Sequence, residues 1–133
     1  MALEADMVRL ARGANFGTVV TLMPSGQPQA QLGWVDSDGE YLLVNTEPQR
    51  QAARNLARDP RVTVLVRDER NPYDWAELRG RVVETVGGEE ARAHIDALAE
   101  KYTGGLYKNP IGPEGRVLLR IAADRVVTPA ARR

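Results

Sequence analysis

The stretch that decides the fold is residues 41–66, YLLVNTEPQRQAARNLARDPRVTVLV. It begins and ends with runs of apolar strand formers. Between these runs, Thr46 and Gln49 have the spacing of a helix capping box, so a helix is predicted to begin just after Thr46. Pro60 disfavours a helical conformation in the residue before it, which predicts that the helix ends by Asp59. The stretch therefore predicts a strand, a capped helix and a second strand.

Arginines form one stripe of this predicted helix, because Arg50, Arg54 and Arg58 recur at intervals of four. Arg50 falls in the first helical turn, where the helix dipole already presents positive charge and a second like charge is unfavourable. A bound anion would explain an arginine at this position, since the free N–H groups of the first turn and a guanidinium together bind phosphate. The alternative is an ordinary solvated face, because all but two of the 18 basic residues are arginine.

Length and composition indicate one globular domain spanning residues 1–133, with 43% hydrophobic and 27% charged residues. No stretch approaches the ~20 apolar residues of a membrane span, and the N-terminus lacks a signal-peptide core, so we expect a cytoplasmic protein without a membrane partner. The absence of cysteine and the single histidine exclude disulfides, thiolate nucleophiles and multi-histidine metal sites. The 18 basic and 18 acidic residues balance, so no nucleic-acid partner is expected.

The remaining patterns predict a β-rich α+β fold. Apolar periodicity predicts a short N-terminal helix that ends at Gly13 and a longer helix over residues 89–102. Further strands are predicted at 16–23, 29–36, 62–67 and 73–86, the last with a bulge or bend at Gly80, and one or two strands at 116–128. Several hairpins and only one strand-helix-strand unit favour a small, mostly antiparallel barrel of six or seven strands with two main helices over a doubly wound sheet.

Two groups of side chains are candidates for binding a flat ligand. Gln29, Gln31 and Gly33 fall on one face of the strand at 29–36, and this polar, shallow face could either receive a planar group or simply face solvent. Tyr73 and Trp75 share one face of a later strand, where they could border a planar ligand or belong to ordinary core or interface packing.

Side chains suited to acid–base or nucleophilic catalysis are few. His94 lies at the edge of a helical stripe and is expected to be structural or surface. Asp36, Asp38 and Glu40 cluster around a predicted hairpin, where turn geometry accounts for the two aspartates. No nucleophile elbow, Walker loop or dinucleotide-binding glycine motif occurs. No catalytic residue is nominated, and a bound cofactor would have to carry the reactive atoms of an enzyme.

Four runs of sequence carry a resemblance to a known family: ARNLARDPRVTVLV (53–66), YDWAELRGRVVE (73–84), AHIDALAEKYTG (93–104) and RVLLRI (116–121). They resemble the split β-barrel flavin and deazaflavin oxidoreductases of the pyridoxamine 5′-phosphate oxidase-like superfamily, in particular the branch that uses coenzyme F420. The resemblance implies an FMN-binding-like barrel and a homodimer with the cofactor in a groove between subunits. It also implies hydride transfer from the reduced deazaflavin to an unsaturated small molecule such as a quinone, enone or tetrapyrrole.

The same resemblance implies which positions contact the cofactor. On the phosphate side these are Asn45, Thr46, Arg50 and Gln51, with Arg54 as a further candidate. On the ring side they are Gln29, Gln31 and Gly33, bordered by Tyr73 and Trp75. Many members carry a lysine two residues before the Arg-Asn-Leu triplet, where this chain has Ala52. The alternatives are an FMN-dependent enzyme of the same superfamily and a non-catalytic protein that binds a flavin or haem.

Overall fold

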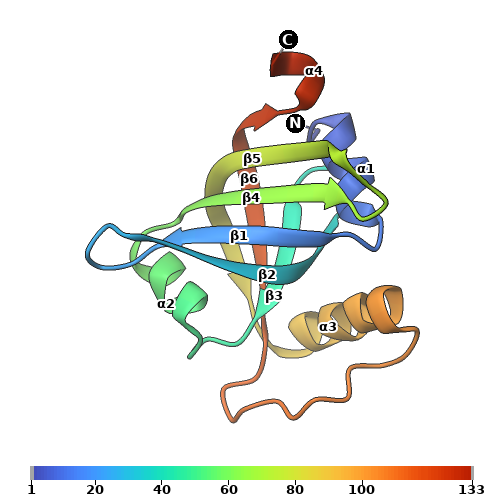
Figure 1. Cartoon of the computed structure of the whole chain (residues 1–133). Helices are drawn as coiled ribbons and strands as arrows, with labels where there is room; N and C mark the ends of the chain where they lie inside the picture. Colours follow the sequence, from blue (N-terminus) through green and yellow to red (C-terminus); the bar gives the residue numbers. More distant parts are fainter. Residues whose placement is uncertain (1, 133) are drawn as a thin grey trace.

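A computed structural model, which describes residues 2–132, shows a closed barrel of six strands in the order β1-β2-β3-β6-β5-β4 (Figure 1). The strands are β1 (Phe16–Leu22), β2 (Pro28–Ser37), β3 (Leu42–Thr46), β4 (Arg61–Asp68), β5 (Asn71–Val86) and β6 (Val117–Val127). Every neighbouring pair is antiparallel. The β-rich barrel predicted from the sequence is confirmed, and the one or two strands expected at 116–128 are the single strand β6.

The helices are α1 (Ala5–Arg12), α2 (Gln51–Arg58), α3 (Gly88–Thr103) and the short α4 (Pro129–Arg132). In Figure 1, α2 and α3 lie below the barrel, and α1 lies against its right-hand side. Gly13 ends α1, as predicted, and its N–H donates to the Arg9 carbonyl at 3.2 Å. No helix within residues 2–132 is long and apolar enough to cross a membrane.

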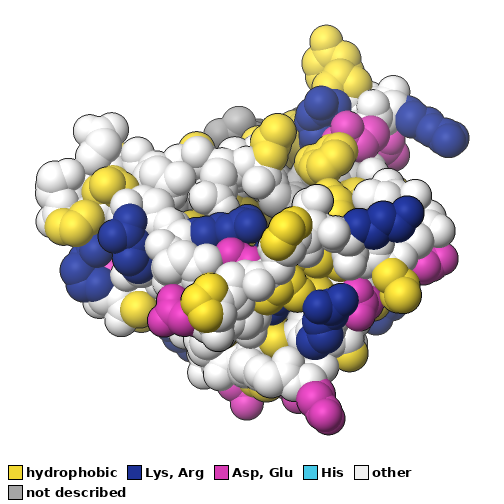
Figure 2. Space-filling view, turned by 90° about the horizontal axis from the view of Figure 1, so that it is seen from below, with side chains coloured by type: hydrophobic (Ala, Val, Ile, Leu, Met, Phe, Trp, Pro, Cys, Tyr) yellow, Lys and Arg dark blue, Asp and Glu magenta, His cyan; other side chains and the backbone are white. Residues whose placement is uncertain are grey.

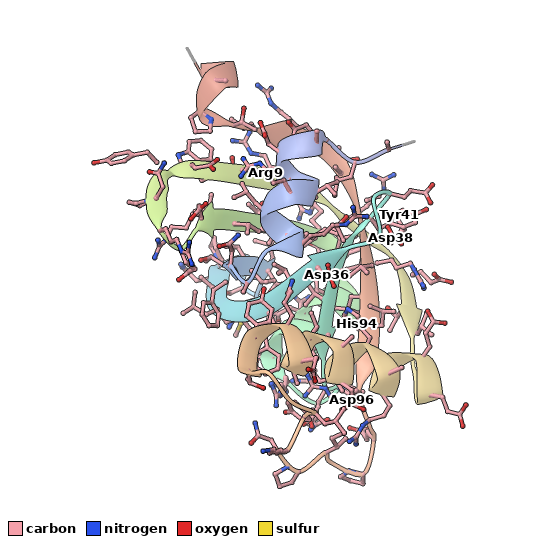
Figure 3. The ribbon with its side chains drawn as sticks, turned by 90° about the vertical axis from the view of Figure 1, so that its right-hand side faces the viewer. Arg9, Asp36, Asp38, Tyr41, His94 and Asp96 are labelled. Atoms are coloured by element: carbon pink, nitrogen blue, oxygen red, sulfur yellow. The ribbon has the colours of Figure 1, made fainter. Side chains whose placement is uncertain are left out.

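The barrel interior is filled by apolar side chains from alternate strand positions and from α1. Met7 and Leu10 of α1 are almost completely buried, as are Val35, Val64 and Leu78 of the strands. This packing uses the apolar stripe that predicted the N-terminal helix. Arg9 of α1 (Figure 3) also donates two hydrogen bonds to the Asp74 carboxylate on β5, at 3.0 and 2.9 Å, and these bonds join the helix to the barrel.

The helix α2 begins at Gln51, so the predicted start just after Thr46 is wrong. Thr46 is the last residue of β3, and its Oγ1 is buried without a hydrogen-bond partner among the described residues. Gln49 does not complete a capping box, because its Nε2 donates to the Glu47 carboxylate at 2.6 Å. Arg50 is therefore the residue immediately before the helix, in extended conformation, and not a member of the first turn.

The end of α2 follows the prediction. The helix stops at Arg58, and the N–H of Asp59 donates to the Asn55 carbonyl at 2.8 Å. Pro60 follows, so the restriction that proline places on the preceding residue accounts for this boundary.

The glutamine face of β2 is sheltered, and the opposite face of the strand is the one exposed to solvent. Gln29, Gln31 and Gly33 are partly buried, whereas Ala30 is exposed and Leu32 is 72% exposed. The alternative in which the glutamine face points to solvent is therefore wrong. The polar face is sheltered, and the outer face of the strand carries the apolar side chain.

Gly80 sits at a β-bulge, as the sequence predicts. The register between β5 and β6 shifts between Arg79 and Gly80. A Cβ added at Gly80 would collide with the backbone carbonyl of Ala122 on β6. The close approach of the two strands therefore depends on the missing side chain.

We expect Gly80→Ala to lower the free energy of unfolding by about 1–3 kcal/mol, because the new methyl group forces the two backbones apart. Thermal and urea unfolding measure this change. Gly105→Ala is the matched control: a Cβ at that loop position meets no atom within 4 Å, so its effect should stay within about 0.5 kcal/mol. Equal stability of the two variants would contradict the bulge assignment.

Candidate cofactor-binding site

A cavity of about 270 Å³ opens between the barrel, α3 and the loop that joins α3 to β6. Strands β1, β2 and β3, the turn before α2, α3 and the loop all contribute to its wall. The lining residues are Phe16, Val19, Gln31, Leu32, Gly33, Trp34, Val44, Asn45, Thr46, Arg50, Ile95, Leu98, Tyr107, Asn109 and Arg116.

One part of the wall is aromatic and rigid. The Trp34 ring stacks on Tyr102 with centroids 5.3 Å apart, and Tyr107 meets Trp34 edge-on at 6.3 Å. The Tyr102 hydroxyl donates to the Asn15 carbonyl and accepts the Val35 N–H at 3.1 Å. Burial raises the pKa of Tyr102 to about 12, so the hydroxyl stays protonated at physiological pH. The apolar wall is therefore held by hydrogen bonds as well as by packing.

Another part of the wall carries two guanidinium groups of different depth. The Arg50 side chain is 51% exposed, whereas that of Arg116 is only 4% exposed. The Glu47 carboxylate lies between them, 3.8 Å from Arg50 Nε and 3.6 Å from Arg116 Nη1. Two cations facing one anion leave a net positive charge at this wall, beside the unpartnered hydroxyl of Thr46.

Glu47 remains ionised in spite of its burial. Desolvation alone would raise the pKa of its carboxyl group, but the hydrogen bond from the Gly112 N–H and the charges of Arg50 and Arg116 bring that pKa below its ordinary value. The Gly112 N–H to Glu47 Oε1 distance is 3.3 Å. The carboxylate therefore fastens the loop between α3 and β6 over the start of α2.

The structure brings part of the predicted site together. The predicted residues that line the cavity are Gln31, Gly33, Asn45, Thr46 and Arg50. Those outside its wall are Gln29, Gln51, Arg54, Tyr73 and Trp75. Tyr73 is 84% exposed near the tip of the β4–β5 hairpin, and Trp75 lines a separate depression on the outer face of the barrel.

Three of the residues outside the cavity belong to one relay of hydrogen bonds that ends at its wall. Each side chain donates to the next, at 2.6, 2.8, 3.0, 3.1 and 3.4 Å, in the order Arg54, Gln51, Asn55, Thr21, Gln29 and Gln31. The middle members, Asn55 and Thr21, are almost completely buried. We call this the Arg54–Gln31 relay; it joins α2 to β1, β2 and the cavity.

Sequence reasoning missed several residues of the wall, above all Arg116 and Tyr107. Arg116 lies 5.1 Å from the Tyr107 ring and directly precedes β6. A cation placed immediately before a buried strand is a weak signal, since nothing local tells whether it points inward. The loop that carries Tyr107 and Asn109 has no motif that predicts a binding role.

His94 is partly buried between α3 and the barrel strands (Figure 3). Its Nδ1 lies 3.0 Å from the Asn45 amide nitrogen, which itself donates to the Ala91 carbonyl at 2.9 Å. Since that amide nitrogen only donates, Nδ1 is the accepting nitrogen and the proton of the neutral ring is on Nε2. His94 therefore supports the wall of the cavity from behind.

Charges of both signs surround the cavity. Figure 2 shows the face that carries α2, α3 and the loop, with cationic, anionic and apolar side chains interspersed over it. The positive charge near Arg50 and Arg116 is thus a local feature, in keeping with the zero net charge of the whole sequence.

The protein is thus a closed antiparallel barrel with helices beside a cavity whose wall is partly aromatic and partly cationic. The family model described as pyridoxamine 5′-phosphate oxidase matches residues 3–128, and the chain belongs to this family.

Solved structures agree with this assignment. One described as an F420 reductase has 30% identity and a TM-score of 0.80, with 90% of this chain and 94% of the other covered. A conserved hypothetical protein from Mycobacterium tuberculosis has 30% identity and a TM-score of 0.73, with 95% and 83% covered. General Stress Protein 26 from Bacillus anthracis has 18% identity and a TM-score of 0.69, with 91% of this chain and 88% of the other covered, and it shows the shared fold. No curated protein matches the sequence.

The single histidine gives a direct test of this geometry. Burial lowers the pKa of His94 from 6.5 to about 4, against the raising effect of Asp36 and with smaller lowering effects of Lys101, Arg120 and Arg116. We expect its one imidazole NMR signal to keep the neutral position, with the proton on Nε2, until the pH falls below about 5.

Stability follows from the same shift. Between pH 6.5 and 4 the unfolded chain binds a proton that the folded chain does not, so the contribution of His94 is complete above pH 6.5 and is lost on acidification. Between pH 7 and 5, the free energy of unfolding should fall less in His94→Asn than in the parent protein. The carboxylates titrate in both proteins, so their contribution cancels when the two pH profiles are compared. A signal that titrates near pH 6.5 would contradict the burial argument.

Proposed function

We propose that this protein is a coenzyme F420-dependent reductase that transfers a hydride from the reduced deazaflavin to an unsaturated small molecule of the quinone, enone or tetrapyrrole type. One observation carries the proposal: a single cavity combines an aromatic wall with two guanidinium groups and an unpartnered buried hydroxyl. A flat ring system with an anionic arm has this combination of surfaces. The 30% identity to an F420 reductase favours the deazaflavin over FMN.

The anionic arm is assigned to the wall at the start of α2. Arg50 and Thr46 line the cavity there, with Asn45 beside them. No side chain of the described residues caps α2, so the N–H groups of its first turn, beginning at Gln51, are available to a phosphate group. Arg54 lies one turn further along α2 and adds positive charge without lining the cavity.

The ring is assigned to the sheltered face of β2. Gly33 leaves this face flat, since the nearest atom to an added Cβ would be a Val19 methyl group at 3.8 Å. Gln31 lies two residues away on the same face, with Gln29 behind it in the Arg54–Gln31 relay. The side chains of Phe16 and Trp34 exclude water from the apolar part of the cavity.

The deazaflavin supplies the hydride when it is bound, and the protein supplies binding and orientation. Arg50 neutralises charge on the anionic arm, and the aromatic wall holds the ring in one position. No side chain is assigned a proton-transfer role, because His94 has its Nδ1 occupied by Asn45. The proposal retains the single 1–133 domain and the cytoplasmic location expected from the sequence.

The proposal includes a homodimer through the outer face of the barrel. Two shallow depressions lie on this face: Phe16 and Leu32 line the first, Trp75 lines the second, and Leu65 and Arg67 line both. Phe16 and Leu32 also line the cavity, so the apolar face continues from the cavity mouth. A second copy that covers it would close the groove.

Charge on this face suits pairing of identical copies. Arg67 lies among Glu69 and Glu77, so a twofold axis can bring the arginine of each copy to the carboxylates of the other. Tyr73 and Trp75, which lie away from the cavity of their own chain, would then border the groove from the partner subunit.

Titration of cofactor-free protein with F420, FMN and FAD, followed by fluorescence quenching and melting temperature, tests the function. We expect F420 to bind at micromolar or lower concentration and more tightly than FMN. Arg50→Ala should weaken F420 binding by roughly 10- to 100-fold, because a charge-assisted contact to phosphate is lost, without lowering the melting temperature.

Arg92→Ala is the matched control for Arg50→Ala. Arg92 is on the outer face of α3 with a side chain 53% exposed, close to the 51% of Arg50, and it also pairs with a carboxylate. Its loss should leave F420 affinity unchanged. FMN preference would move the function to the flavin branch, and absence of binding to all three cofactors would refute the redox proposal.

The dimer has its own test. Leu32→Asp places a charge on the proposed interface, so light scattering after size exclusion should show a dimer for the parent and a monomer for the variant. Val83→Asp is the control, since Val83 is also an exposed apolar residue, at 46%, but lies on β5 outside the two depressions. A monomeric parent protein would refute the interface.

A further inference from the structure

The Arg116 guanidinium is the most deeply placed charge in the cavity wall. Its side chain is 4% exposed, and burial lowers the pKa of Arg116 in spite of the neighbouring Glu47. Its Nε donates to Asn45 Oδ1 at 2.8 Å, and Nη1 approaches the Tyr107 hydroxyl at 3.4 Å. The hydrogen bonds of this guanidinium to the described residues are made by Nε and Nη1, and none by Nη2. A buried cation with unused donors at a cavity wall is suited to bind an anion.

Asn45 fixes the direction of this guanidinium. Its amide nitrogen donates to the Ala91 carbonyl at 2.9 Å and to His94 Nδ1 at 3.0 Å, so both amide hydrogens are used. Its oxygen accepts from Arg116. The amide cannot rotate by 180°, because a carbonyl oxygen only accepts and a guanidinium only donates. Asn45 thus has no N–H left for a ligand, although it lines the cavity.

His94 completes the arrangement from α3. Its Nε2 is buried without a hydrogen-bond partner among the described residues, which is unfavourable, whereas Nδ1 receives the second hydrogen of the Asn45 amide. The favourable contact of this imidazole is therefore the one that orients Asn45.

We propose that Arg116 binds the anionic oxygens of the ligand from inside the cavity, and that Asn45 and His94 are positioning residues that hold its guanidinium in place. This inference rests on the proposed function for the identity of the ligand, a cofactor with a phosphate group. The buried Arg116 and the exposed Arg50 would contact the phosphate group from different depths.

The inference predicts a loss confined to the phosphate group. Affinities are measured for FMN against riboflavin and for F420 against its phosphate-free chromophore, with melting temperature as the readout of folding. Arg116→Met should weaken binding of the phosphate-bearing member of each pair by roughly 10- to 100-fold and leave the phosphate-free member within about 2-fold. A purely structural role would weaken both members equally, and that result would overturn the inference.

The positioning residues have a matched pair of variants. His94→Leu removes the acceptor for Asn45 and should weaken phosphate-dependent binding by roughly 3- to 10-fold, whereas His94→Asn keeps an acceptor close to the Nδ1 position and should restore most of it. Equal loss in the two variants would overturn the role of His94. If Arg116→Met does not fold, the double variant Glu47→Gln/Arg116→Met removes the unpaired buried carboxylate and takes its place.

Inorganic phosphate separates this inference from the proposed function. If none of the cofactors binds the parent protein, the proposed function fails, and the effect of phosphate on the melting temperature is compared with that of chloride at equal ionic strength. Stabilisation of the parent by phosphate that is absent in Arg116→Met supports the anion site. No stabilisation of the parent overturns it. Cofactor binding that is unchanged in Arg116→Met overturns the inference and leaves the proposed function intact.

Discussion

The position of α2 depends on the buried amide of Asn55. This side chain has no exposed surface, yet it donates to Thr21 on β1 and accepts from Gln51 on its own helix. A buried amide without partners costs about 1–3 kcal/mol, so the helix is held where these bonds form. With only eight residues, α2 has little stability of its own, and its placement comes from tertiary contacts. The turn that presents Arg50 to the cavity is fixed by the same contacts.

Elements specified by local sequence could be predicted. The barrel strands follow from period-two patterns separated by turn residues, and the Gly80 bulge follows from a glycine inside a long strand pattern. The start of α2 could not be predicted in this way. Thr46 and Gln49 have the right spacing for a cap, but Glu47 between them is held by Gly112 and Arg116, which lie far along the chain. A tertiary ion pair and its hydrogen bonds replaced the local capping pattern.

The residues of the candidate site also divide into those that local sequence could predict and those that depend on long-range pairing. Gln31, Gly33 and Thr46 reach the cavity because each lies on or at the end of a strand that the sequence identifies. Arg116 reaches it only because β6 pairs with β3, with Thr46 opposite Val117, and this pairing brings together strands separated by more than half of the chain. The buried positive charge of this cavity therefore comes from that long-range pairing, whereas position 52 near the start of α2 is an alanine.

The Arg54–Gln31 relay has a direction, and the direction has a chemical consequence at the cavity. Arginine can only donate, so Gln51 must turn its carbonyl oxygen toward Arg54 and its amide hydrogens toward Asn55. Asn55 donates in turn to the Thr21 hydroxyl, which can both accept and donate. In the structure Thr21 donates to Gln29, and Gln29 donates to the Gln31 oxygen. The group that Gln31 can offer to a ligand is then its amide N–H. We expect a ligand atom that faces this amide nitrogen to be a hydrogen-bond acceptor, such as a ring carbonyl or an unprotonated ring nitrogen, because a donor there would face another donor.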